Sequence, residues 1–92
     1  MRLVLTEAAL RDLDEILAFT ATHHPTAYAA LERRLHATLR RITAWPEAAQ
    51  TVTGRPGIRT VPLVRYPFRI FYRVAGDRIE ILHIHHAARA PL

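Results

Sequence analysis

Residues 68–85 read FRIFYRVAGDRIEILHIH, two alternating runs of apolar and polar residues on either side of a Gly-Asp pair. Alternation with a period of two is typical of strands, and Gly76-Asp77 suits the two-residue loop of a β-hairpin. Such a loop determines which residues face each other, and an Arg opposite a Glu supports this register. The predicted cross-strand pairs are Val74 with Ile79, Arg73 with Glu80, Tyr72 with Ile81 and Phe71 with Leu82.

This register predicts a hairpin with two unlike faces. On the outward face Phe71, Leu82 and Ile84 would form an apolar patch bordered by Arg69 and Arg73. A patch of this kind on a small protein usually marks a binding surface. The opposite face is expected to pack on a second layer, and it holds Phe68, Ile70, Tyr72, Val74, Ile79, Ile81, His83 and His85.

Two amphipathic helices are predicted before the hairpin, over residues 7–22 and 25–44. Apolar residues repeat there every three or four positions, as one face of a helix requires. Thr6 suits the N-cap of the first helix, and Pro25 suits the first position of the second. Trp45-Pro46 ends the second helix, whose arginines flank its apolar stripe and are interpreted as a solvated face.

Further strands are predicted at residues 3–5 and 58–63. Pro62 has no N–H to donate, so the strand at 58–63 ends there or is unpaired on one side. Residues 46–57 contain proline and glycine without an apolar period, which indicates a surface loop. The predicted fold class is therefore α+β, one domain over residues 1–92: an N-terminal strand, an antiparallel helix hairpin and three antiparallel strands, with the helices packed on one face of the sheet.

Composition restricts the function classes open to the chain. Its 92 residues include no cysteine and no apolar run approaching the roughly 20 residues of a membrane span. We therefore expect a cytoplasmic protein without disulfides and without a membrane partner. Residues 1–32 have a net charge of −3 and residues 33–92 of +8, with arginine as the basic residue throughout. An acidic protein or a nucleic acid is the expected partner of the second part.

The candidates for metal binding are His83, His85 and His86, with His23 or His24 as a third ligand. Alternate strand positions could offer two imidazoles to a zinc ion, but no carboxylate lies near them in the sequence to complete or orient the set. We therefore expect no metal site and no cofactor. The sequence also has no glycine-rich phosphate-binding loop and no motif of a Ser/His/Asp catalytic triad. Nucleotide-binding and serine hydrolase functions are therefore without support.

Phosphoryl chemistry is the alternative that the residues leave open. Arg69, Arg73 and Arg89 could surround a phosphate, but a guanidinium is too weak a base to activate a hydroxyl. A metal-free ribonuclease would therefore need a histidine, tyrosine or carboxylate near the attacking 2′-hydroxyl, and His85 or His86 could move the proton near neutral pH.

The order of elements resembles the RelE/ParE toxins of bacterial type II toxin–antitoxin systems. The resemblance covers nearly the whole chain. It is most specific in YPFRIFYRV at residues 66–74 and in the ending ILHIHHAAR at residues 81–89.

The resemblance implies one of two activities. Members of the RelE branch cut messenger RNA on the ribosome, whereas members of the ParE branch bind and poison DNA gyrase. Arg69 and Arg89 match two basic positions of the endonuclease branch, but Thr60 and Pro62 stand where that branch offers lysines, and its C-terminal tyrosine is missing. We therefore expect a ParE-like gyrase inhibitor, with a metal-free, ribosome-dependent endoribonuclease as the alternative. The candidate catalytic residues of that alternative are Arg69, Arg89, His85 and His86.

The resemblance also implies an acidic antitoxin as partner, in an oligomeric toxin–antitoxin complex. An acidic amphipathic segment would cover an apolar patch between arginines. The residues expected to bind the antitoxin or the target are Arg69, Phe71, Arg73, Leu82, Ile84 and Arg89.

Overall fold

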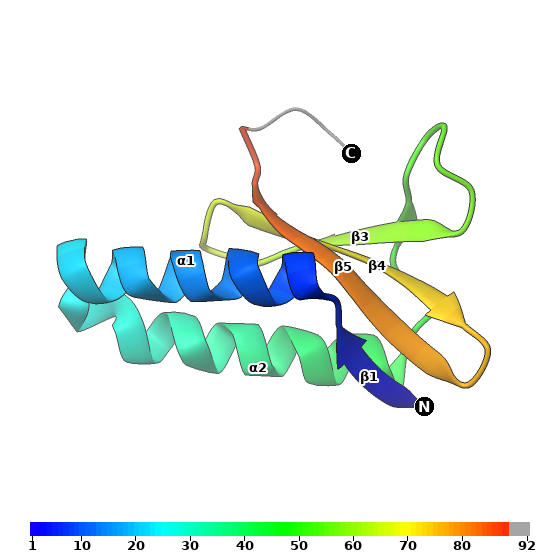
Figure 1. Ribbon diagram of the computed structural model, residues 1–92, viewed down its shortest axis with the longest axis horizontal. Helices are drawn as coiled ribbons and strands as arrows, with labels where there is room; N and C mark the ends of the chain where they lie inside the picture. Colours follow the sequence, from blue (N-terminus) through cyan, green and yellow to red (C-terminus); the bar gives the residue numbers. More distant parts are fainter. Residues whose placement is uncertain (89–92) are drawn as a thin grey trace.

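The computed structural model describes residues 1–88 as two helices packed against a mostly antiparallel sheet (Figure 1). This confirms the predicted α+β architecture. In chain order the elements are β1 (Arg2–Leu5), α1 (Glu7–His23), the short 3₁₀ helix η1 (Pro25–Ala27), α2 (Tyr28–Ala44), β2 (Gln50–Thr51), β3 (Ile58–Pro62), β4 (Phe68–Ala75) and β5 (Arg78–His86).

Local signals mark the helix boundaries close to where the sequence predicted, except that α2 begins at Tyr28, three residues later than expected. The Thr6 hydroxyl accepts a hydrogen bond from the Ala9 N–H at 3.1 Å, which satisfies one free donor at the start of α1. Pro25 follows the end of α1 and opens the short 3₁₀ turn into α2. α2 ends directly before Trp45-Pro46. Within the described residues, no helix is long and apolar enough to cross a bilayer.

The sheet has the strand order β1-β5-β4-β3-β2. β1 is parallel to β5, and the other neighbours are antiparallel. β2 was missed, because it lies in the segment predicted as a loop. It is only two residues long and pairs with Arg59 and Thr60 of β3. β3 ends at Pro62, as expected of a residue that cannot donate to a ladder.

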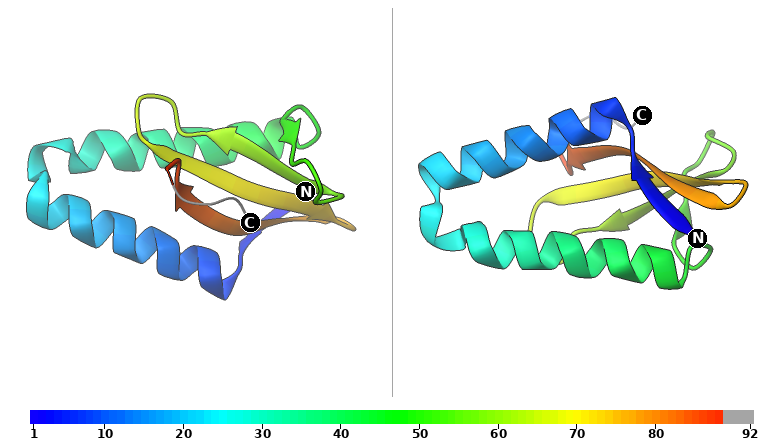
Figure 2. Two further views of the ribbon diagram at one scale, coloured as in Figure 1. Left: turned by 90° about the horizontal axis from the view of Figure 1, so that it is seen from above. Right: turned by 60° about the horizontal axis from the view of Figure 1, so that its bottom comes forward.

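The core lies between the helix pair and the sheet (Figure 2). Leu31, Leu35 and Ile42 repeat along α2 and are buried against the sheet. Tyr72 of β4 is also fully buried, and its hydroxyl donates a 2.7 Å hydrogen bond to the carbonyl of Pro46. This bond ties the end of α2 to the centre of the sheet. The sheet residues of the core cluster include Ile70, Tyr72, Ile79, Ile81 and Ile84.

The predicted hairpin register is correct near the turn and wrong beyond it. Val74 with Ile79, Arg73 with Glu80 and Tyr72 with Ile81 are confirmed, but Phe71 pairs with His83 rather than with Leu82. A bulge places one extra residue, Leu82, in β5. Since side chains alternate with a period of two, one inserted residue moves every later side chain to the opposite face.

The predicted apolar patch is therefore not an exposed surface. Ile84 turns into the core opposite Ile70 and is 2% exposed. Phe71 keeps its place on the outward face but is only 6% exposed. In exchange His83 and His85, which were expected on the packed face, join Phe71 on the outward face.

Candidate functional site

The candidate site begins where α1 covers the edge of β5. β1 ends at Leu5, opposite Ile81, so the next part of β5 needs other partners. Thr6 supplies two of them: its N–H donates to the Ile81 carbonyl and its hydroxyl to the Leu82 carbonyl, both at 3.0 Å. These bonds hold the backbone on either side of the bulge.

Asp12 continues this edge six residues further along the chain, in α1. Its Oδ2 accepts a 3.0 Å hydrogen bond from the Ile84 N–H and lies 3.3 Å from Nδ1 of His83. The Asp12 carboxylate therefore accepts the backbone hydrogen bond that a neighbouring strand would otherwise accept, and it also orients the His83 imidazole. The predictions omitted Asp12, which is 71 residues away from His83 in the chain.

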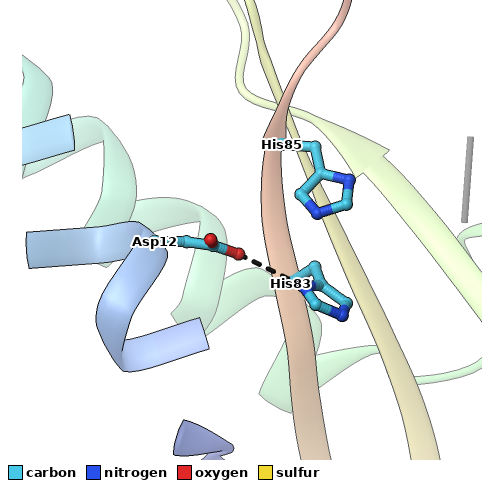
Figure 3. A group of neighbouring side chains, drawn as sticks. All are labelled: Asp12, His83 and His85. Carbon is cyan, nitrogen blue, oxygen red and sulfur yellow. Dashed lines mark hydrogen bonds and ion pairs between the residues drawn. The ribbon is translucent and has the colours of Figure 1, made fainter. Parts of the chain in front are cut away.

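His83 and His85 lie side by side with Asp12 (Figure 3). Their ring centroids are 4.6 Å apart, because residues two positions apart on a strand share a face. One ligand atom from each of the three side chains falls within 4.8 Å of the others. The carboxylate that the sequence lacked beside its histidines is thus supplied by the fold.

Arg69 lies next to this group on the outward face. It is the cross-strand partner of His85, and its Nε donates a 3.1 Å hydrogen bond to the Thr60 hydroxyl. Phe71 fills the neighbouring position, with its ring centroid 5.6 Å from that of His85. The structure thus brings together Arg69 and His85, two of the residues named for a ribonuclease.

His86, another of the predicted ribonuclease residues, is not part of this group. His86 falls on the opposite face of β5, where its ring packs edge-on against Phe68, and its Nδ1 accepts from the Ala88 N–H at 3.1 Å. Arg89 lies outside the described residues.

Arg73 is engaged in an ion-pair network at the hairpin end. Its Nε lies 2.7 Å from Oε1 of Glu80, and Arg78 contacts the second oxygen at 3.0 Å. Hydrogen bonds from Arg73 and then from Arg78 lower the pKa of the Glu80 carboxyl. The predicted Arg73–Glu80 pair is confirmed, and the side chain of Arg73 remains 54% exposed.

Sequence reasoning missed a cleft of about 480 Å³ between the second half of α2 and β3. Its surface is mainly apolar, and arginines at its border bring positive charge. Two large apolar residues beside the cleft are exposed, Trp45 at 69% and Val64 at 53%. Their exposure marks the cleft in the structure, but the apolar periodicity of a helix in the sequence does not reveal it. Lining residues include Arg34, Thr38, Arg41, Trp45, Val61 and Val64.

Solved structures with the same fold define the class of protein. The chromosomal ParDE TA system from P. aeruginosa contains a chain that is 27% identical, with a TM-score of 0.69 and coverage of 94% of this chain and 95% of that one. The isolated E. coli RelE toxin has a TM-score of 0.67 at 19% identity, covering 97% and 86% of the two chains. The architecture is therefore that of the RelE/ParE toxins.

The sequence comparison is more specific. Residues 3–91 match the family described as "ParE toxin of type II toxin-antitoxin system, parDE". The protein named "Putative toxin Y4kP" from Sinorhizobium fredii (strain NBRC 101917 / NGR234) is 34% identical over 90 residues, which are 94% of this chain and 88% of that protein. The chain belongs to the ParE toxin family.

Proposed function

We propose that this chain is a ParE-like toxin that inhibits DNA gyrase by binding it. The family match supports this reading, and the surroundings of Arg69 carry it. The guanidinium of Arg69 donates a hydrogen bond to the Thr60 hydroxyl, and Pro62 is the cross-strand partner of Arg69 on β3. Neither neighbour is a second cation or a base, although the endonuclease branch offers lysines at these two positions.

The chemistry of these neighbours favours binding over cleavage. Cutting RNA at the 2′-hydroxyl requires a group that takes a proton and charges that stabilise the phosphate. Thr60 and Pro62 provide neither, and a guanidinium stays protonated at every physiological pH. On its β3 side, the surroundings of Arg69 therefore favour recognition of an acidic partner over cleavage.

Supercoiling by purified gyrase tests the proposal directly. Added toxin should prevent the conversion of relaxed plasmid into supercoiled plasmid in the presence of ATP. Arg69→Ala should weaken inhibition at least about tenfold if this face contacts the enzyme, since charged contacts at interface centres often contribute more than 1 kcal/mol. Arg40→Ala, an exposed arginine on α2, is the matched control and should inhibit like the wild type. Full supercoiling activity at saturating toxin would contradict the proposal.

Ribosome-dependent cleavage of messenger RNA is the second candidate function. It is favoured by one observation, the position of His85 opposite Arg69 and beside the Asp12–His83 pair. Primer extension on translating ribosomes would then show new RNA ends that disappear with Arg69→Ala or His85→Gln. His86→Gln, one residue away on the other face of β5, should cleave normally. Such a result would replace gyrase as the target.

We also propose that an acidic, amphipathic segment of a cognate antitoxin neutralises the toxin by binding the cleft between α2 and β3. The predicted patch of Phe71, Leu82 and Ile84 is not available for this role. The cleft has the required combination of apolar lining, exposed Trp45, and positive charge from Arg34 and Arg41. These properties match an amphipathic segment that carries carboxylates along its border.

Calorimetry with the cognate antitoxin tests this surface. Trp45→Asp should weaken binding at least about tenfold, because an exposed aromatic anchor is replaced by a charge that repels an acidic partner. Phe19→Asp is the matched control: Phe19 is similarly exposed, at 57%, but lies on α1 outside the cleft. Equal affinity of wild type and Trp45→Asp would remove the cleft from the antitoxin interface.

A further inference from the structure

We propose that Asp12, His83 and His85 form a binding site for a divalent transition-metal ion of the zinc class, which fastens α1 to β5. The three side chains come from two elements that the chain order keeps far apart (Figure 3). They occupy a partly buried position at the edge of the sheet, with 17% of the Asp12 side chain and 34% of the His83 side chain exposed. This inference is independent of whether the toxin acts on gyrase or on RNA.

The donor set selects the class of ion. Two imidazole nitrogens and one carboxylate oxygen suit Zn²⁺ and its neighbours in the first transition series, whereas Mg²⁺ and Ca²⁺ prefer oxygen alone. Three protein ligands leave a fourth tetrahedral position for water or for a group from another molecule.

The distances are close to those that a tetrahedral ion requires. Bonds of about 2.0–2.1 Å place neighbouring ligand atoms about 3.3 Å apart. Oδ2 of Asp12 and Nδ1 of His83 already have this separation, 3.3 Å. All three ligand atoms lie within 4.8 Å of one another, so the ligands must close by at most about 1.5 Å.

The surrounding contacts hold the ligands in place before an ion arrives. The Ile84 N–H fixes Asp12, and the strand places His83 and His85 on the same side of β5. Arg69 lies opposite His85 on the neighbouring strand β4. Its Nε is directed towards Thr60 on β3, on the far side of β4 from Asp12.

Zinc titration of the tag-free, full-length chain tests the site. Isothermal calorimetry should show one saturable Zn²⁺ per chain, and zinc should raise the thermal midpoint of unfolding. His85→Gln should lower zinc affinity by at least about tenfold and abolish the thermal shift, because loss of even an outer partner of a ligand costs about 10–100-fold. His86→Gln is the matched control and should bind zinc like the wild type.

Two further measurements keep the result independent of folding defects. Circular dichroism without metal establishes that each variant is folded, and Asp12→Asn replaces His85→Gln if the latter is not. Co²⁺ added to the wild type should give the intense visible absorption of a four-coordinate ion. Absence of saturable zinc binding, or equal binding by wild type and a folded His85→Gln or Asp12→Asn variant, would overturn the proposal.

Discussion

The carboxylate of Asp12 accepts a hydrogen bond from the backbone N–H of Ile84 at 3.0 Å, although 72 residues separate them. A side chain of the first helix thereby occupies the place of a strand partner at the edge of β5. An exposed strand edge invites pairing with other chains, so this contact also protects the sheet. It lies next to the bulge that turns Ile84 into the core.

Removing the Asp12 carboxylate should destabilise the fold. Asp12→Ala leaves the Ile84 N–H without its acceptor, and we expect a loss of about 1–3 kcal/mol in the free energy of unfolding. Asp12→Asn keeps an oxygen acceptor and should lose less. Urea unfolding followed by circular dichroism measures both values. Equal stability of Asp12→Ala and wild type would show that the contact contributes nothing.

Because of the bulge, truncation of Ile84 and of Leu82 should reduce the free energy of unfolding by different amounts. Ile84→Ala should cost about 2–4 kcal/mol, because Ile84 is buried in the core and truncation leaves a cavity. Leu82→Ala should cost less, because the Leu82 side chain is only half-buried. Uninterrupted alternation would place both residues on the outward face and give them similar costs. Chemical denaturation of the two variants therefore distinguishes the two registers.

Tyr72 links stability to alkaline pH. Tyr72→Phe removes the hydrogen bond to the Pro46 carbonyl and should cost about 1 kcal/mol near neutral pH. Burial raises the pKa of the Tyr72 hydroxyl above its usual value of 10.0. Since the native state holds this proton more tightly, wild-type stability should fall as the pH rises above 10. Thermal unfolding between pH 8 and pH 11 should show a smaller alkaline loss for the Phe variant.

Glu80 makes the corresponding prediction in acid. Its pKa is lowered from 4.5 by the Arg73 and Arg78 hydrogen bonds, so its ionised form is favoured in the native state. The resulting stability is present above pH 4.5 and is lost as the pH falls through the lowered value. Glu80→Gln should therefore be less stable than wild type at pH 7, and the difference should shrink below pH 4.5. A difference that stays constant from pH 7 to pH 3 would contradict this account.

Most of the fold was predictable because its signals are local. Thr6, Pro25 and Trp45-Pro46 mark the helix boundaries through backbone rules that need no tertiary information. The Gly76-Asp77 turn likewise determined the pairs between it and the bulge. β2 escaped prediction because a two-residue strand has no periodicity of its own.

The candidate site was only partly predictable. Arg69 and His85 were named from the sequence, and they face each other across the sheet. The expectation that His83 and His85 would lie on the packed face failed at Leu82, where one extra residue reverses the alternation. The cleft beside Trp45 also escaped prediction, because its two walls come from α2 and β3, and their approach depends on packing.

The two helices, the longer strands, the hairpin turn and the membership of a toxin family can be derived from the sequence alone, since each rests on residues close together in the chain or on overall similarity. Only the tertiary structure decided that Asp12 meets His83 and that Ile84 enters the core. The physical reason is that β1 ends before β5 does. The uncovered strand edge takes its hydrogen bonds from whatever the first helix presents, and periodicity within a single strand contains no information about that neighbour.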